Sequence, residues 1–230
     1  MREPGRAPAR NLVGFKGIVS ILAIASAVLA EYAGEALLGV TQPSADPFPL
    51  SIHIWDAGIL MLINKGLANP FFSWFFGAFT WLGSNLSIFT IGVVLYLYRR
   101  KREGALVLAS LIAGTLVTFP LKLAIMRPRP FLTIPDIVPF GVEAGSSFPS
   151  GHAVRAFAFA FVMSRLRPKL KILLYLFAGL IAFSRIYLGQ HYPFDVFAGI
   201  LIGVLAGCFT VNNQGKILKT ISGLGIAADS

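Results

Sequence analysis

Three short stretches of this 230-residue chain hold ionisable side chains that could do chemistry at the ends of apolar segments. They are KLAIMRPRP at 122–130, FPSGH at 148–152 and SRIYLGQHYPFD at 184–195. Ionisable residues beside membrane-length apolar runs are costly and usually mark a functional site. The residue types are cations, a helix-start glycine and two histidines, and together they suit phosphate chemistry.

The stretch FPSGH predicts an anion site at the start of a helix. Ser150 is a favoured N-cap residue, and Gly151 allows a ligand to approach the N–H groups at the positive end of the helix dipole. The other two stretches add three cations, Lys122, Arg129 and Arg185. Arginine's planar fork suits phosphate oxygens, and each charge-assisted hydrogen bond contributes about 1.5–3 kcal/mol. We expect these five residues to hold a phosphoryl group and to stabilise a five-coordinate phosphorus.

The two histidines outside the cation set suit nucleophilic and acid–base roles. Pro193 favours a helix start, so His191 precedes the helix and Asp195 lies one turn away, where its carboxylate can accept the ring N–H. An oriented, neutral imidazole is a nucleophile. His152, on a different helix, can protonate the departing oxygen and later take a proton from water, which is worth about 10²–10⁴-fold in rate.

Two further arginines and a third histidine have less specific surroundings. Arg127 either contacts a second phosphate of a diphosphate substrate or pairs with Asp136 or Glu143. Arg155, one turn after His152 in the predicted helix, is expected to face the site because a lipid-facing charge is costly. His53 lies far from the three stretches and is expected at the membrane interface.

The elements that must position these residues are membrane helices. The chain is 56% hydrophobic and 13% charged, with a mean hydropathy of +0.73, which excludes an ordinary soluble domain. Apolar stretches long enough to cross a bilayer predict an all-α protein in a single domain over 1–230. The six predicted transmembrane helices cover 14–32, 79–98, 104–121, 152–166, 171–187 and 193–211.

The net charge is +10, and the basic residues are distributed as expected for the two sides of a membrane rather than for a nucleic-acid-binding surface. Four basic clusters fall on one side of the six spans, and by the positive-inside rule that side is cytoplasmic. The clusters are Arg2–Lys16, Arg99–Arg102, Arg165–Lys171 and Lys216–Lys219. Both termini are therefore predicted to be cytoplasmic in a plasma or inner membrane, and the three polar stretches extracytoplasmic. The single cysteine, Cys208, makes a cysteine metal cluster implausible.

The segment 33–78 holds no full span. Its prolines predict an external loop, and the part from 53 to 78 predicts one or two short interfacial helices lying along the membrane surface. The tryptophans Trp55, Trp74 and Trp81 are expected at the outer interface. The span at 14–32, although preceded by a basic leader, is interpreted as an uncleaved anchor rather than a signal peptide.

At residues 122–195 the pattern K-x6-RP, PSGH and SR-x5-H-x3-D resembles the type 2 phosphatidic acid phosphatase superfamily, which also contains vanadium haloperoxidases and glucose-6-phosphatases. The resemblance implies a six-helix membrane phosphatase that works through a phosphohistidine without a metal or other cofactor. It assigns His191 as the nucleophile, Asp195 as its partner and His152 as the general acid. It assigns phosphoryl binding to Lys122, Arg129, Ser150, Gly151 and Arg185.

A site at the outer ends of the spans would lie at the height of lipid headgroups, so we expect an extracytoplasmic lipid phosphatase. Polyprenyl diphosphate is favoured over phosphatidic acid and phosphatidylglycerol phosphate, because of the RPRP doublet and the short loop at 131–148. Three alternatives remain. A lipid phosphotransferase would use the same intermediate with an acceptor hydroxyl, a haloperoxidase would bind vanadate, and a non-enzymatic anion transporter would gather arginines without needing two histidines.

Overall fold

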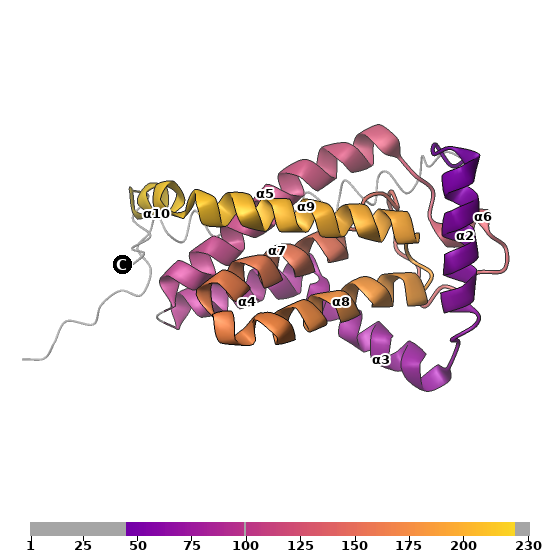
Figure 1. Cartoon of the computed structure of the whole chain (residues 1–230), viewed down its shortest axis with the longest axis horizontal. Helices are drawn as coiled ribbons and strands as arrows, with labels where there is room; N and C mark the ends of the chain where they lie inside the picture. The colour runs from indigo at the N-terminus through magenta and orange to yellow at the C-terminus, as the bar shows by residue number, and fades with distance from the viewer. Residues whose placement is uncertain (1–44, 99, 224–230) are drawn as a thin grey trace, which may run out of the picture.

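The structure, a computed structural model, describes residues 45–98 and 100–223. All regular secondary structure within these ranges is helical, which confirms the all-α prediction for this part of the chain (Figure 1). The α-helices are α2 (Leu50–Asn64), α3 (Pro70–Thr80), α4 (Asn85–Leu97), α5 (Lys101–Ile125), α6 (Pro130–Thr133), α7 (Gly151–Leu166), α8 (Lys171–Tyr187), α9 (Pro193–Asn212) and α10 (Gln214–Gly223). Short 3-10 turns, η1 (Trp81–Gly83) and η2 (Pro168–Leu170), precede α4 and α8.

Helix α7 is the centre of the bundle and packs against α4, α5, α8 and α9. Its inward side chains, including Phe159, Val162 and Met163, form an apolar core with Leu106 and Leu111 of α5. Burying such side chains contributes roughly 1.5–3 kcal/mol each. The core therefore fixes α7, whose first residues belong to the FPSGH stretch.

Close packing between α7 and α9 sets the two helix starts side by side. Gly203 of α9 lies so near α7 that an added Cβ would be only 2.4 Å from the carbonyl oxygen of Val154. Small residues permit this approach of two backbones, as they commonly do between membrane helices. At the same end of the pair, the Ser150 N–H donates to the carbonyl of Asp195 at 3.0 Å. The packing thus brings the second and third polar stretches together.

The bounds of α7, α8 and α9 agree with the last three predicted spans. The second and third predicted spans differ from the observed helices. Helix α5 extends to Ile125, beyond the expected end at 121. The expected span at 79–98 is not one straight helix, because α3 with η1 and α4 meet at a break with a bend of 53°. Asn69 and Ser84 each cap a separate helix start with their side chains, so the chain restarts at both positions.

The count of six spans stays a prediction. Three helical segments are long and apolar enough to cross a membrane, or four if the bent pair is one span. They are Lys101–Thr133, Pro168–Tyr187 and Pro193–Asn212, with the pair Pro70–Gly83 and Asn85–Leu97. Helix α7 has only 16 residues and includes Arg155 and Arg165, while the expected span at 14–32 lies outside the described residues.

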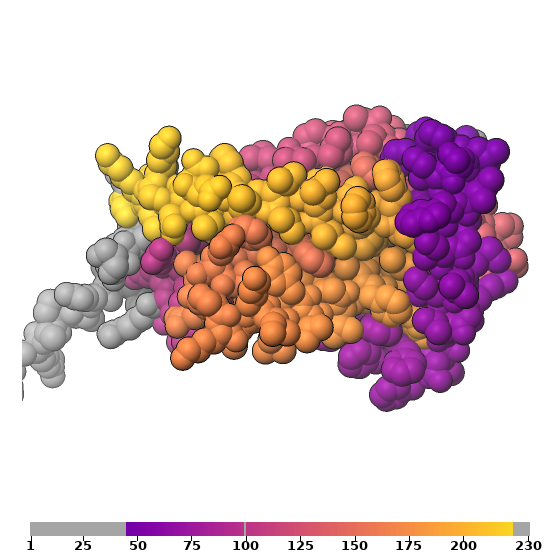
Figure 2. Space-filling model, in the orientation of Figure 1, coloured from indigo at the N-terminus to yellow at the C-terminus, as the bar shows by residue number. Residues whose placement is uncertain are grey.

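Helix α2 runs across the end of the bundle, where α8 ends and α9 begins (Figure 1). The space-filling view shows it covering that end (Figure 2). Leu60 of α2 packs with Ile137 and Tyr192 in a small apolar cluster, which fixes the helix there. The outer faces of α8 and α9 expose apolar side chains such as Leu176 and Leu205, the pattern of helices that face lipid. The three tryptophans expected at the interface are also exposed.

Candidate active site

A cavity of about 490 Å³ lies where α7 begins and α8 ends. It is lined by both histidines of the polar stretches and by cations from the first and third of them. The polar lining residues include Lys122, Arg129, Glu143, His152, Arg155, Arg185 and His191, together with Gly151. The structure therefore brings together most of the predicted site residues, although they come from separate elements.

Three buried cations are fixed around this cavity by contacts with the backbone and with neighbouring side chains. Lys122 donates to the carbonyl of Ser146 at 2.9 Å. Arg129 donates from Nε to the Gly145 carbonyl at 3.1 Å, and its other nitrogens reach further carbonyls of the surrounding loops. Arg185 donates from Nη1 to Thr80 Oγ1 at 3.0 Å. These side chains are held in place before any ligand arrives, which lowers the entropy cost of binding an anion.

A carboxylate lies between two of these cations. Glu143 Oε1 is 2.5 Å from Arg185 Nη2, and Glu143 Oε2 is 3.2 Å from Arg129 Nη1. Burial raises the pKa of Glu143, but the Arg185 and Arg129 guanidiniums outweigh it and hold that pKa well below its usual value. An ionised carboxylate thus bridges two arginine forks, which is the kind of contact that a phosphate also makes.

His191 lies in the turn between α8 and α9. Gly189, at φ +67°, allows this turn, and the N–H groups of Gln190 and His191 both donate to the carbonyl of Arg185. The ring Nδ1 is 2.7 Å from the Ser147 carbonyl oxygen, which can only accept, so Nδ1 carries the proton. Burial, reinforced by the neighbouring guanidiniums, lowers the pKa of His191 to about 4, so the ring is neutral at pH 7 and Nε2 keeps its lone pair.

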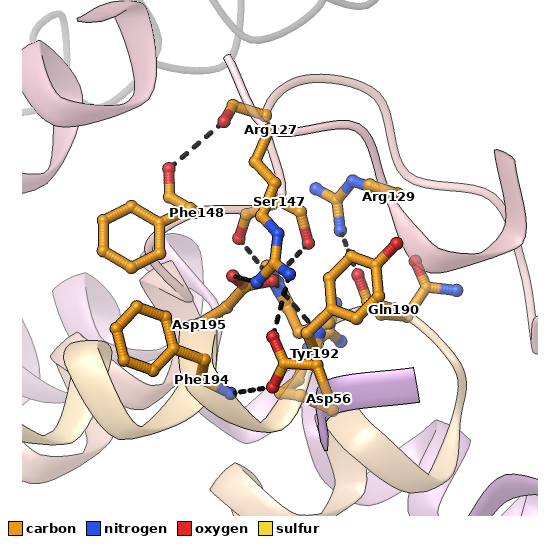
Figure 3. Close-up of polar contacts among 12 residues, drawn as sticks. Asp56, Arg127, Arg129, Ser147, Phe148, Gln190, Tyr192, Phe194 and Asp195 are labelled. Atoms are coloured by element: carbon orange, nitrogen blue, oxygen red, sulfur yellow. Dashed lines mark hydrogen bonds and ion pairs between the residues drawn. The ribbon is translucent and has the colours of Figure 1, made fainter. Parts of the chain in front are cut away.

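Asp195 is near His191 but holds it indirectly. Its Oδ2 lies 3.8 Å from His191 Nδ1 and accepts from Ser147 Oγ at 2.5 Å and from the Tyr192 N–H at 3.0 Å. Its Oδ1 accepts from Arg127 Nη1 at 2.6 Å (Figure 3). The expectation that the carboxylate directly accepts the ring N–H is wrong, because the Ser147 carbonyl occupies that position.

His152 and Arg155 also line the cavity, near the start of α7. Arg155 Nη2 is 3.4 Å from His152 Nδ1, while Arg155 Nε donates to the Gly83 carbonyl at 3.1 Å. A Cβ on Gly151 would lie 2.8 Å from Arg155 Nη1, so the glycine makes room for this guanidinium. Arg155 faces the cavity as expected.

Ser150 does not have the expected geometry. It precedes α7, but its side chain makes no capping hydrogen bond, and its buried Oγ has no hydrogen-bond partner among the described residues. Ser150 is also absent from the described cavity lining, which Gly151 reaches instead. Its N–H joins α7 to the carbonyl of Asp195, and its role in phosphate binding stays a prediction.

Arg127 has neither of the partners expected for it. Its fully buried guanidinium contacts Asp195, Asp46 and Asp56 at 2.6, 2.7 and 2.8 Å. Asp136 instead pairs with Lys65, and Glu143 with the cavity arginines. Arg127 is also absent from the cavity lining, so the structure does not favour a contact with a second phosphate. His53, which was expected at the interface, hydrogen-bonds Asp46 at 2.8 Å.

Sequence reasoning missed four polar residues around the site. Glu143 and Ser147 lie in the loop before α7, whereas Asp46 and Asp56 precede or belong to α2. One signal was available: these acidic residues fall in segments that the topology places on the same side as the three polar stretches. No spacing rule connects them to His191, because their contacts join positions far apart in the chain.

Within the described ranges, the structure contains no group of three or more His, Cys, Asp and Glu side chains arranged to hold a metal ion. The three carboxylates near Arg127 surround a guanidinium instead.

Comparisons with known proteins identify the family of this chain. The profile of the PAP2 superfamily matches residues 103–219. Undecaprenyl-diphosphatase BcrC of Bacillus subtilis is 35% identical over 98 residues, which are 42% of this chain and 50% of BcrC, so the match spans about half of that relative.

Two solved structures have the same fold. Aquifex aeolicus LpxE aligns with a TM-score of 0.65 at 32% identity over 73% of this chain and 98% of its own. A transmembrane PAP2-type phosphatidylglycerolphosphate phosphatase from Bacillus subtilis aligns with a TM-score of 0.62 at 25% identity, over 83% of this chain and 96% of its own. With its long apolar helices, the protein is an integral membrane protein. The chain belongs to the PAP2 superfamily.

Proposed function

We propose that this protein is a membrane lipid phosphatase that transfers the phosphoryl group to His191 and then to water. One observation carries the proposal: His152 and His191 line a single cavity together with Lys122, Arg129 and Arg185. An anion transporter would use the cations but has no need of a neutral, oriented imidazole opposite a second histidine. The family's named members support the same reaction class.

The geometry supports a two-step reaction. The phosphoryl group would replace the Glu143 carboxylate between Arg129 and Arg185. The Nε2 lone pair of His191 would attack phosphorus while the bond to the lipid oxygen breaks. His152, protonated once the phosphate dianion is bound beside it, would give its proton to that oxygen. Water would then attack phosphorus, pass its proton to His152 and leave phosphate and neutral His191.

The buried cations would favour the transition state over the ground state. Negative charge on the equatorial oxygens of a five-coordinate phosphorus is more concentrated than in the bound ester, and pre-positioned donors stabilise it without reorganising. Lys122, Arg129 and Arg185 are already fixed by contacts that leave the cavity open. Gly151 adds the N-terminus of α7, as the sequence predicts.

The substrate proposed is a lipid phosphate, with polyprenyl diphosphate favoured over phosphatidylglycerol phosphate and phosphatidic acid because of the similarity to an undecaprenyl-diphosphatase. Arg127, which lies outside the cavity lining, adds nothing to this preference. The cavity is also lined by apolar side chains, namely Trp81, Phe140, Val142 and Leu188. Trp81 and Val142 are also exposed on the outer surface, which suits a lipid whose tails stay in the bilayer. The basic clusters of the sequence support an extracytoplasmic position for the cavity and cytoplasmic termini.

Phosphate release from purified protein tests the proposal. Wild-type protein in detergent should release phosphate from at least one of the three lipids without an added acceptor, and EDTA should not stop it. His191→Ala should abolish release and the acid-labile phosphoprotein formed with labelled substrate, whereas Arg167→Lys, at the far end of the bundle, should change neither. Near-normal turnover of His191→Ala would reject the nucleophile, and product formed only with an acceptor alcohol would indicate a phosphotransferase.

A further inference from the structure

Arg127 lies behind the cavity rather than in its wall. Its guanidinium is fully buried and contacts three carboxylates from three separate segments, namely Asp46, Asp56 of α2 and Asp195 of α9. We propose that Arg127 is a positioning residue for His191, acting through Asp195 and Ser147, and that α2 is part of this support. The proposal rests on the phosphatase reaction above, because the group positioned is its nucleophile.

Two paths lead from Arg127 to the imidazole. Through its side chain, Arg127 Nη1 donates to Asp195 Oδ1 at 2.6 Å, and Asp195 Oδ2 accepts from Ser147 Oγ at 2.5 Å. Through its backbone, the Arg127 carbonyl accepts from the Ser147 N–H at 2.8 Å. Ser147 is therefore held at both its N–H and its hydroxyl, and its carbonyl is the group that fixes His191 Nδ1 at 2.7 Å.

A local backbone feature places Arg127 there. Helix α5 ends at Ile125, and the next residue, Met126, has a φ of +48° in the left-handed region, which stops the helix. A non-glycine residue in this region costs energy and persists only where the surroundings require it. After this turn, Arg127 points to the buried carboxylates, whereas Lys122, in the last turn of α5, reaches the cavity.

Arginine is needed because a single group must bridge three acceptors. Nη1 contacts Asp195, Nη2 contacts Asp46 and Asp56, and Nε reaches both Asp46 oxygens at 3.1 and 3.2 Å. The central carbon of the guanidinium, Cζ, lies 3.8 Å from the centre of the Tyr192 ring (Figure 3). A lysine ammonium is a point charge and cannot reproduce this planar fork.

The alternative roles of Arg127 make different predictions. A contact with a second phosphate would require its nitrogens to reach the cavity, yet all three already contact carboxylates and the side chain is fully buried. A purely structural role would affect folding and leave turnover per folded molecule unchanged. A positioning role predicts a loss of turnover with an intact phosphate-binding cradle.

The test compares Arg127→Lys with a matched Arg167→Lys control, whose arginine pairs with Glu103 at the opposite end of the bundle. We expect Arg127→Lys to lower kcat by about 10–100-fold, as small displacements of a reacting group commonly do. KM and the affinity for vanadate should change less than twofold, and the loss should be equal for monophosphate and diphosphate lipids. An unchanged kcat, or a rise in KM confined to diphosphates, would overturn the proposal.

A double variant tests the path through Asp195. If Arg127 acts through that carboxylate, Arg127→Lys combined with Asp195→Asn should lose no more than about twofold beyond Asp195→Asn alone, because the two changes remove the same support. Multiplied losses would show independent roles and reject the path.

Folding and the underlying reaction need separate readouts. If Arg127→Lys does not fold, Arg127→Met with Asp46→Asn and Asp56→Asn removes two of the three carboxylate charges that Arg127 balances, while Asp195 keeps its hydrogen bonds from Ser147 and Tyr192. We expect this variant to fold with the same loss of kcat. Wild-type turnover in that variant would overturn the proposal. The ring ¹⁵N shifts of His191 should change in Arg127→Lys and not in Arg167→Lys. Unchanged ring shifts in Arg127→Lys would reject the positioning role, whether or not the wild-type protein releases phosphate. Failure of the wild-type protein to release phosphate would reject the phosphatase proposal separately.

Discussion

Asp195 Oδ2 and His191 Nδ1 are 3.8 Å apart, too far for a hydrogen bond although one helical turn separates the two residues. The Ser147 carbonyl, 2.7 Å from Nδ1, fixes the tautomer instead. Asp195 acts in two other ways, since it holds the Ser147 hydroxyl and places a negative charge near the ring. That charge would stabilise the positive imidazolium ring of a phosphohistidine.

Asp195→Asn should therefore impair the reaction without abolishing it. The Ser147 carbonyl would still hold the ring in its reactive tautomer, but the charge that stabilises the imidazolium would be gone. We expect kcat to fall by about 10–100-fold with KM within about threefold, measured by phosphate release under saturating lipid. A loss as complete as that of His191→Ala would contradict this division of roles, because it would make the carboxylate itself indispensable.

His152→Asn should show a dependence on the leaving group. A lipid alkoxide needs a proton to depart, whereas p-nitrophenolate departs without one. We expect the variant to lose about 100-fold or more in kcat/KM on a lipid phosphate and less than about tenfold on p-nitrophenyl phosphate. His191→Ala should lose both activities. Equal losses of His152→Asn on the two substrates would reject the general-acid role.

The parts of the site that the sequence predicts well are those that local rules control. Pro193 begins α9 as expected, and the bounds of α7 and α8 agree with the apolar runs. The three polar stretches therefore arrive at one end of the bundle because each is attached to a helix end. These local rules were sufficient to predict that His152 and His191 lie at the same cavity.

The parts that the sequence does not predict depend on contacts across many residues. Ser147 meets His191 across 44 positions, and Asp46 meets Arg127 across 81. These contacts are set by the path of the loops before α2 and α7, for which no periodic pattern exists. The Ser147 carbonyl could not be identified from residue type, because every residue has one. The bend before α4 was missed since the apolar run continues through it.

The stability of the protein should fall on acidification because of His191. Its pKa is about 4 in the folded state, mainly because of burial, and 6.5 without the fold, so between these values the unfolded state binds more protons. Stability should therefore rise with pH from about 4 to 6.5 and level off above. The slope contributed by this one group is at most about 1.4 kcal/mol per pH unit.

Thermal unfolding in detergent between about pH 5 and 7.5 measures this effect, with His191→Gln as the control. Wild-type protein should lose stability on acidification relative to the variant. Burial raises the pKa of Glu143 and Asp46, but neighbouring arginines lower both below their usual values, so these carboxylates titrate below the measured range. A wild-type protein that gains stability relative to His191→Gln at low pH would show that the folded ring is charged.

Glu143→Gln should strengthen anion binding. The carboxylate lies between Arg129 and Arg185, so an incoming phosphate must displace it and is repelled by its charge. The amide keeps the shape of the side chain and removes the charge. Because Glu143 is partly exposed, we expect vanadate to inhibit the variant at about two- to fivefold lower concentration, the range of an exposed ion pair.

The control is Asp136→Asn, which changes an exposed carboxylate of the same loop. Asp136 pairs with Lys65, so this variant should leave inhibition by vanadate unchanged. Weaker inhibition of Glu143→Gln would mean that this carboxylate holds the two arginines in their phosphate-binding positions instead of competing for them.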